Sequence, residues 1–247
     1  MALRGWLLLK GLAREARHWG PFPSLLADAG RQPLLLDLPG VGTEHQRTSP
    51  GKVEGIVDDL RERFLRAGTG PWGLFAQSLG GMIALDWAAR YPSDFVRVAV
   101  SNTSTSDLSP LRDRISRRGL KMLVRAGAER DPVRREQVAL DLISNSPLSW
   151  ARAAEFGQFA KDAPIQKRNI VRQLIAGARS RSPADLPIPL LVLASEHDRM
   201  VSWDCSRALA ERYQATLRLH PSAGHELALD DPGWVVKELL AFEVSSD

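Results

Sequence analysis

The sequence predicts an α/β protein in which a mostly parallel sheet is covered by helices on both faces. Short apolar runs bounded by turn residues recur along the chain, helix-like segments lie between them, and 247 residues suffice to bury a large core. Such alternation is typical of parallel sheets with helical crossovers. We expect buried strands at residues 6–9, 33–38, 72–76, 96–100 and 189–194, and a shorter one at 216–219.

Three helices are expected between and after these strands. Apolar residues recur at helical spacing within residues 52–66, which predicts an amphipathic helix. Residues 79–90 form a second helical segment, and Pro92 follows its end as a stop signal. A final helix is expected after Pro232.

The alternation breaks between residues 107 and 182, where several helical segments are separated by prolines. We therefore expect a core formed by residues 1–106 and 183–247, with residues 107–182 inserted as a helical cap or lid. The side chains expected to face inward in this insertion are Ile115, Met122, Leu123, Val138, Leu142, Ile143, Phe156, Phe159, Ile170, Leu174 and Ile175.

The overall composition is that of a globular protein, with 44% hydrophobic and 25% charged residues. The apolar run at residues 6–9 is shorter than a signal-peptide core, and no run approaches the roughly 18 residues that span a bilayer. Cys205 is the single cysteine, which excludes an internal disulfide and suits a reducing compartment. We expect a cytoplasmic protein with no membrane span.

The net charge is +4, but basic residues are concentrated in the insertion at 107–182. One interpretation is a solvated, arginine-rich helical surface. The other is a surface that binds an acidic partner, such as an acyl carrier protein. We do not expect nucleic acid binding, because no aromatic residues are interleaved with the basic ones. The densest basic cluster consists of Arg112, Arg114, Arg117, Arg118 and Lys121.

Ser78 lies where a predicted strand runs directly into a predicted helix. A serine on such a turn is held in a strained conformation, and the close approach of strand and helix requires small residues two positions before and after it. Ala76 and Gly80 meet this requirement. The turn would expose the Ser78 hydroxyl. It would also point the Leu79 N–H toward the place where an oxyanion forms, so that this N–H could stabilise the oxyanion.

A serine nucleophile needs a base, and the base needs an acid to orient it. Among the five histidines, His225 is the candidate base because its loop follows the last predicted strand and would lie over the same edge of the sheet as Ser78. Asp198, just after the strand at 189–194, is the candidate acid. Glu196 is the alternative acid, two residues closer to that strand.

These features resemble the α/β-hydrolase family over nearly the whole chain. Further similarities are the segments 10–12, 37–42 and 224–226, and Asp231-Pro232. The order Ser78, Asp198, His225 is that of the family. The resemblance implies that the Leu12 N–H is the second oxyanion donor beside Leu79. Lys10 stands where the family usually has a histidine, and Ala76 where it usually has a glycine.

Within that family, the sequence resembles small carboxylesterases and the pimeloyl carrier-protein methyl ester esterases. The resemblance implies hydrolysis of a small-molecule carboxylic ester through an acyl-enzyme, without a cofactor or metal. The alternatives are a thioesterase, a lactonase or an acyltransferase on the same fold. A catalytically silent protein that uses this fold for binding is the alternative from another functional class.

Overall fold

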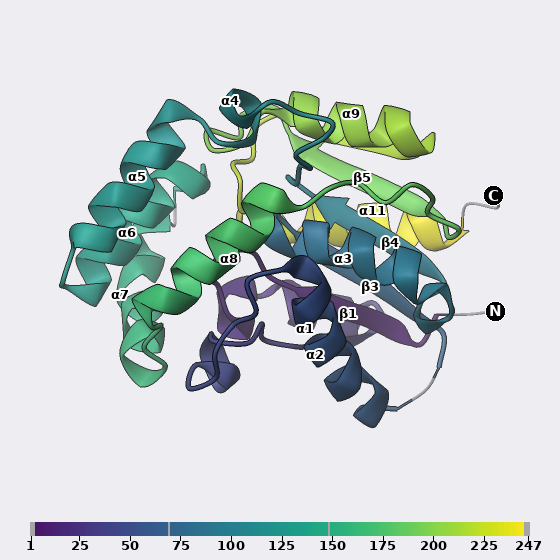
Figure 1. Ribbon diagram of the computed structural model, residues 1–247, viewed down its shortest axis with the longest axis horizontal. Helices are drawn as coiled ribbons and strands as arrows, with labels where there is room; N and C mark the ends of the chain where they lie inside the picture. The colour runs from purple at the N-terminus through teal and green to yellow at the C-terminus, as the bar shows by residue number, and fades with distance from the viewer. Residues whose placement is uncertain (1–2, 69, 148, 245–247) are drawn as a thin grey trace.

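The computed structural model describes residues 3–68, 70–147 and 149–244, within which six parallel strands form a single sheet (Figure 1). Its spatial order is β2-β1-β3-β4-β5-β6. Leu7 of β1, for example, lies opposite Leu34 on one side and Leu74 on the other. The predicted parallel sheet is therefore confirmed. The strands are β1 (Gly5–Leu9), β2 (Gln32–Leu35), β3 (Trp72–Gln77), β4 (Arg97–Ser101), β5 (Leu190–Ser195) and β6 (Thr216–His220).

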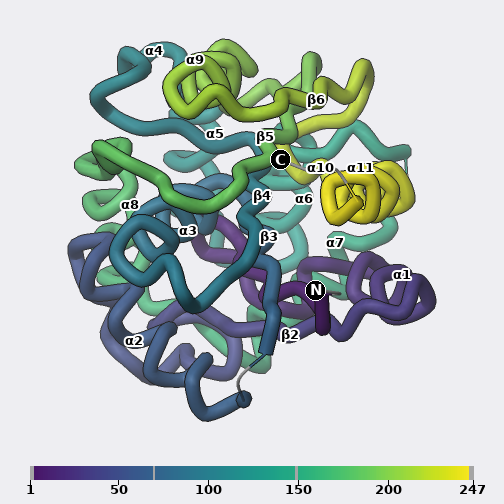
Figure 2. The backbone as a smooth tube through the Cα atoms, turned by 90° about the vertical axis from the view of Figure 1, so that its right-hand side faces the viewer, coloured from purple at the N-terminus to yellow at the C-terminus, as the bar shows by residue number. Residues whose placement is uncertain are grey.

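Helices cover both faces of the sheet, as Figure 2 shows from one end of the strands. Successive side chains of a strand point to opposite faces, so Leu7 and Leu9 join one apolar core while Trp6 and Leu8 join the other. The first core is covered by α2 (Val53–Arg66), α3 (Leu79–Arg90) and α9 (Trp203–Tyr213). The second is covered by α1 (Phe22–Asp28), α10 (Leu227–Asp230) and α11 (Pro232–Val244).

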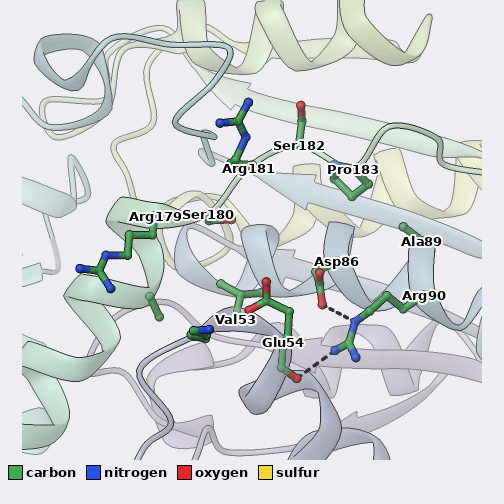
Figure 3. Close-up of a pocket in the computed structure, with 12 residues that line it drawn as sticks. Val53, Glu54, Asp86, Ala89, Arg90, Arg179, Ser180, Arg181, Ser182 and Pro183 are labelled. Atoms are coloured by element: carbon green, nitrogen blue, oxygen red, sulfur yellow. Dashed lines mark hydrogen bonds and ion pairs between the residues drawn. The ribbon is translucent and has the colours of Figure 1, made fainter.

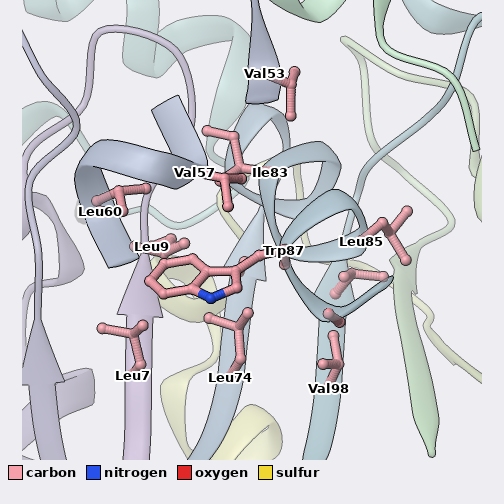
Figure 4. Close-up of a cluster of buried hydrophobic side chains, with 14 of the residues drawn as sticks. Leu7, Leu9, Val53, Val57, Leu60, Leu74, Ile83, Leu85, Trp87 and Val98 are labelled. Carbon is pink, nitrogen blue, oxygen red and sulfur yellow. The ribbon is translucent and has the colours of Figure 1, made fainter. Parts of the chain in front are cut away.

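The core beneath α2 and α3 is centred on large side chains from both layers (Figure 4). Trp87 of α3 is fully buried and lies over Leu74, while Val57 and Ile83 meet between the two helices. Fully burying a side chain of this size stabilises the fold by about 1.5–3 kcal/mol. This packing fixes the strand β3 and the helix α3, and so the turn that joins them.

The second strand is shorter than predicted, because it ends at Leu35 and not at residue 38. Beyond it, Asp37 turns its carboxylate toward the neighbouring loops. One oxygen accepts the N–H of Ala16 at 2.7 Å, and the other accepts the N–H of Thr43 at 2.8 Å. Short 3-10 helices lie at Ala16–Trp19, before β2, at Gly42–Glu44, after it, and at Pro92–Asp94.

The chain between β4 and β5 is helical, and three of its helices gather at one end of the sheet (Figure 1). Helices α5, α6 and α7 share a small apolar core of their own, which includes Met122, Leu140 and Phe156 and reaches Leu229 of α10. The helices of this segment are α4 (Leu111–Arg114), α5 (Arg117–Ala128), α6 (Pro132–Ile143), α7 (Ser149–Asp162) and α8 (Lys167–Arg179).

Helix α8 is turned differently from the expectation. Leu174 and Ile175 were expected to face inward, but they are 37% and 39% exposed. Asn169 and Gln173 are fully buried in their place. The reason is hydrogen bonding: the Asn169 side chain accepts from Ser49 N–H at 3.0 Å and donates to the Arg47 carbonyl at 2.9 Å. Satisfied amides can be buried at little cost, so polar contacts determine which face of α8 packs inward.

Candidate active site

Ser78 forms the junction between β3 and α3 in a backbone conformation that non-glycine residues rarely adopt. Its φ is 56° and its ψ is −120°, which costs about 1–3 kcal/mol. The surrounding contacts hold it there: Ser78 N–H donates to the Ser101 carbonyl at 2.9 Å, and Thr103 Oγ1 donates to the Ser78 carbonyl at 2.7 Å. A strained serine held by its neighbours in this way is what a nucleophile on a sharp turn requires.

The close packing around this turn depends on Gly80. A Cβ at that position would lie 2.6 Å from the carbonyl oxygen of Leu9, so no side chain fits. Leu79 is the first residue of α3, and the N–H groups of a helix's first turn have no partner within the helix. The Leu79 N–H, which the sequence predicts as an oxyanion donor, is one of these groups.

His225 and Asp198 form a buried pair. His225 Nδ1 lies 2.7 Å from Asp198 Oδ2, and the two side chains are 5% and 1% exposed. Asp198 Oδ1 accepts two further hydrogen bonds, from the N–H groups of Met200 at 2.7 Å and Val201 at 3.0 Å. An ionised carboxylate only accepts, so Nδ1 carries the proton and Nε2 is the basic nitrogen of the ring.

Burial and Asp198 act on His225 in opposite directions. Burial alone would lower the pKa of His225, but the Asp198 carboxylate outweighs it, and the pKa lies above the ordinary 6.5. Glu226 raises this pKa further, and Lys10 lowers it. The ring is thus arranged as a base whose protonated form is stabilised by Asp198.

Glu196, the alternative acid, and His220, the histidine nearest to His225 in the sequence, have other contacts. Glu196 is exposed, and its N–H donates to the His220 carbonyl at 2.9 Å. His220 Nδ1 accepts the N–H of Ala223 at 2.9 Å, and its ring packs against Trp234. The structure thus brings Asp198, and not Glu196, into contact with His225.

The loop after β1 passes directly over the serine. A Cβ on Gly11 would lie 3.0 Å from Ser78 Cβ and 3.4 Å from its Oγ. Ala13, two residues on, has a φ of 55°, and its N–H donates to Gln173 Oε1 of α8 at 3.1 Å. Leu12 lies between these two residues in the chain, and its N–H is the second oxyanion donor that the family resemblance implies.

Asn102 is a residue of this site that sequence reasoning missed. It follows β4 with a φ of 46°. Its Nδ2 donates to the His225 carbonyl at 2.9 Å, and its Oδ1 accepts the N–H of Ser195 at 2.9 Å. Asn102 thus connects the histidine loop, residues 221–226, to the end of β5. The acid loop, residues 196–202, follows that strand. The available signal was the run of polar residues 101–106 directly after a buried strand.

The segment after α6 contacts both the acid loop and the histidine loop. The Glu226 N–H donates to the Ile143 carbonyl at 2.7 Å. Arg199 donates to the Ser144 carbonyl at 2.8 Å. Asn145 Nδ2 donates to the carbonyls of His197 at 3.2 Å and Ser222 at 3.0 Å. The end of α6 is therefore attached to the two loops that carry Asp198 and His225.

The predicted basic cluster divides into two parts. Arg114 is half-buried, and its guanidinium donates to the Gly177 carbonyl at 2.6 Å and the Ala178 carbonyl at 3.1 Å at the end of α8. The other members are exposed; they are Arg112, Arg117, Arg118 and Lys121.

A cavity of about 390 Å³ lies on another side of the molecule, between the start of α2, the end of α3 and the residues after α8 (Figure 3). Arg90 beside it donates to Asp86 at 2.8 Å and to the Glu54 carbonyl at 2.9 Å. None of the predicted site residues lines this cavity.

Over 3–68, 70–147 and 149–244, no three His, Cys, Asp or Glu side chains are grouped to hold a metal ion. Across the same ranges, no helix combines the length and apolar character needed to cross a membrane.

Comparison with known proteins gives a consistent picture. The sequence model described as "Alpha/beta hydrolase family" matches residues 7–238. The "Putative carbamate hydrolase RutD" of Agrobacterium fabrum is 25% identical over 252 residues, covering 98% of this chain and 93% of that protein.

Solved structures share the fold at low identity. The 2-hydroxy-6-oxo-6-phenylhexa-2,4-dienoate hydrolase of Rhodococcus sp. strain RHA1 has a TM-score of 0.77 at 20% identity, covering 98% of this chain and 91% of that one. The enol-lactonase of Burkholderia xenovorans LB400 has a TM-score of 0.77 at 16% identity, covering 99% and 93%.

Proposed function

The chain belongs to the α/β-hydrolase family, and from this premise we propose that it is a serine hydrolase that cleaves a carboxylic ester through an acyl-enzyme. The observation that carries the proposal is the buried His225–Asp198 pair, with its 2.7 Å contact, on the same edge of the sheet as the strained Ser78. A nucleophile, a base and an acid that orients the base are the parts that acyl transfer needs.

In the proposed reaction, His225 Nε2 takes the proton of Ser78 Oγ as that oxygen attacks the ester carbonyl. Asp198 stabilises the imidazolium that forms. The N–H groups of Leu12 and Leu79 bind the negative oxygen of the tetrahedral intermediate. The imidazolium then protonates the leaving alcohol, and the acyl group stays on Ser78. A water, deprotonated by His225, then attacks the acyl-enzyme. As the bond between the acyl carbon and Ser78 Oγ breaks, the imidazolium returns the proton to Ser78 Oγ and the acid is released.

The experiment that tests the proposal is the replacement of Ser78 by Ala. It should abolish turnover of p-nitrophenyl esters and labelling by a fluorophosphonate probe, since the probe reacts only with an activated serine. Ser24→Ala, on the exposed face of α1, is the matched control and should retain both. Ester turnover by Ser78→Ala would refute the assignment. A wild-type protein that the probe does not label would support the silent binding protein instead.

The class of bond cleaved is a further part of the proposal. An ester is the simplest substrate for this arrangement, but thioesters, lactones and acyl transfer use the same parts. The similarity to a protein named as a carbamate hydrolase adds carbamates to the set worth testing. A panel with one acyl group presented as ester, thioester, lactone and carbamate separates these candidates. We expect the ester to have the highest kcat/KM.

We further propose that residues 107–182 are the lid of this site. Two contacts support it. A Cβ at Gly177 of α8 would lie 3.2 Å from Leu79, which places that helix directly over the start of α3. Arg14, in the loop after β1, forms a buried ion pair with Glu136 of α6. The lid helices therefore touch the loop and the helix that carry the two proposed oxyanion donors.

The exposed part of the basic cluster is proposed to bind an acidic acyl carrier protein. Arg117, Arg118 and Lys121 lie on α5 beside Leu120 and Val124, which are 57% and 67% exposed. Exposed apolar side chains surrounded by cations suit a partner with an acidic, partly apolar helix, because opposite charges steer the encounter.

A further inference from the structure

Lys10 and Glu226 form an ion pair in the interior of the protein. Their side chains are 2% and 6% exposed. The Lys10 ammonium also lies 4.3 Å from the centre of the Trp19 ring, which is itself buried. Lys10 and neighbouring Arg14 hold the pKa of Glu226 below its ordinary value despite burial, which by itself would raise that pKa. The carboxylate is therefore ionised and faces a cation.

Gln77 connects this pair to the rest of the site. Lys10 Nζ lies 3.4 Å from Gln77 Oε1, and Gln77 Nε2 donates to the His225 carbonyl at 2.7 Å. The Gln77 side chain is buried as well. Lys10, Gln77 and Glu226 thus form a continuous polar network within the apolar core.

Each member of the network is adjacent in the sequence to a residue of the candidate site. Lys10 directly precedes Gly11, which lies over the serine. Gln77 directly precedes Ser78, and Glu226 directly follows His225. The three loops that supply the oxyanion donor, the nucleophile and the base are therefore joined through the residues next to the reacting groups.

We propose that Lys10 and Glu226 are a positioning pair, which fixes the loop after β1 relative to the histidine loop so that Leu12, Ser78 and His225 are held in one reactive geometry. The proposal rests on the serine hydrolase function above and deepens it. It also accounts for Lys10, which departs from the histidine usual in the family. The acid on the opposite loop is the partner that a lysine at this place requires.

The pair is expected to act as a unit. Removing one member leaves the other charge buried without its counter-ion, whereas removing both charges leaves none unpaired. Other charged groups face the pair and the base: Asp198 contacts His225, while Arg14 and Asp230 act on the pair from the loop after β1 and from α10. Glu226 and Lys10 themselves act on His225 with opposite signs.

The experiment compares Lys10→Met, Glu226→Gln and the double variant in ester hydrolysis across pH. Each single variant should lose about 100-fold in kcat/KM, mostly through kcat, since a displacement near 1 Å in a catalytic geometry costs that much. The double variant should recover part of the loss. Lys10→Arg keeps the charge and should retain more activity than Lys10→Met.

The pH profile separates positioning from general damage to the fold. The acid limb of kcat/KM reports the deprotonation of His225. Loss of the Glu226 charge removes an influence that raises this pKa, so the limb of Glu226→Gln should move to lower pH. Loss of the Lys10 charge should move the limb of Lys10→Met to higher pH, and the double variant should lie between them.

The exposed pair Arg66 and Glu62 provides the matched control. Arg66→Met with Glu62→Gln should change neither rate nor pH profile. Wild-type kinetics in both single variants at positions 10 and 226, or limbs that move in the same direction, would overturn the inference. Should a single variant fail to fold, the double variant and Lys10→Arg still test the inference. Equal losses of kcat/KM in these two variants would overturn it. Failure of the proposed function itself is distinguishable, because the wild-type protein would then not be labelled at Ser78.

Discussion

Gln173 of α8 and Ala13 of the loop after β1 are joined by a hydrogen bond, in which the Ala13 N–H donates to Gln173 Oε1 at 3.1 Å. The Gln173 side chain is fully buried, and its Nε2 lies 3.4 Å from the Pro39 carbonyl. Helix α8, part of the proposed lid, is therefore attached to the backbone next to the Leu12 amide, our proposed oxyanion donor.

Gln173→Leu should lower kcat/KM by about tenfold and destabilise the fold. The leucine keeps the volume but leaves the half-buried Ala13 N–H without its acceptor, and an unsatisfied donor costs at most about 1–3 kcal/mol. Steady-state kinetics and urea unfolding measure the two effects. Gln158→Leu, on the exposed face of α7, is the control. Unchanged kinetics in Gln173→Leu would contradict the positioning of the loop by α8.

Asn102 should show two separable contributions to stability. Asn102→Gly loses the hydrogen bonds to the His225 carbonyl and Ser195 but tolerates the φ of 46°. Asn102→Ala loses the same bonds and adds backbone strain, so it should be the less stable variant in urea unfolding, by about 1 kcal/mol. Equal stability of the two variants would mean that the left-handed backbone carries no cost here.

The His225–Asp198 pair predicts opposite pH trends for activity and stability. Because the pKa of His225 is raised above 6.5, kcat/KM should rise as pH rises through that higher pKa. The stability that the pair contributes should be fully present below pH 6.5 and lost as pH rises through the folded-state pKa. The unfolding free energy that wild type gains over His225→Gln should therefore be larger at low than at high pH.

Replacing the acid tests the same pair from the other side. Asp198→Asn removes the group that raises the pKa of His225, so the acid limb should move to lower pH. The amide no longer enforces the productive tautomer, and kcat should fall by about 10⁴-fold. A similar loss in Glu196→Gln, whose side chain is exposed, would contradict the assignment of the acid.

The proposed carrier-binding surface predicts a salt effect that depends on the substrate. Replacing Arg117, Arg118 and Lys121 by Glu should reduce turnover of an ester borne by an acidic carrier protein and abolish most of its salt dependence. Turnover of a neutral soluble ester should be unchanged. Lys237→Glu, exposed on α11, is the control. Equal effects on both substrates would refute the docking role.

The parts of the structure that were predictable are those with a local signal. The strands were visible as apolar runs because both faces of a parallel sheet are buried. Ser78 was visible because a strand, a serine and a helix follow one another without a loop. The chain order of Asp198 and His225 then followed from the topology.

The parts that were missed depend on contacts between distant segments. Leu174 and Ile175 have the spacing of a buried face. The hydrogen bonds of Asn169 and Gln173 to other loops instead bury the face of α8 that carries these two amides. Asn102 acts through backbone atoms of β5 and the histidine loop, which no periodicity reveals. Lys10 looked like an isolated departure because Glu226, its partner, is 216 residues away.

Gly11 gives the sharpest test of the geometry above the serine. Its backbone is not in the left-handed region, so alanine is tolerated locally, but the added Cβ would lie 3.0 Å from Ser78 Cβ and 3.4 Å from Oγ. In the proposed reaction, the methyl group would occupy the space beside Ser78 that the substrate carbonyl enters. Gly11→Ala should therefore lose about 100-fold in kcat/KM and label more slowly with a fluorophosphonate, while its unfolding free energy changes little.

Gly51→Ala is the matched substitution for this test, because a Cβ there meets no atom within 4 Å. It should behave as wild type in all three measurements. Full activity in Gly11→Ala would place the acyl group on another side of Ser78 and so exclude Leu12 as an oxyanion donor. A large loss of stability without loss of activity in the folded protein would lead to the same conclusion, since the methyl group would then disturb packing and not the reacting atoms.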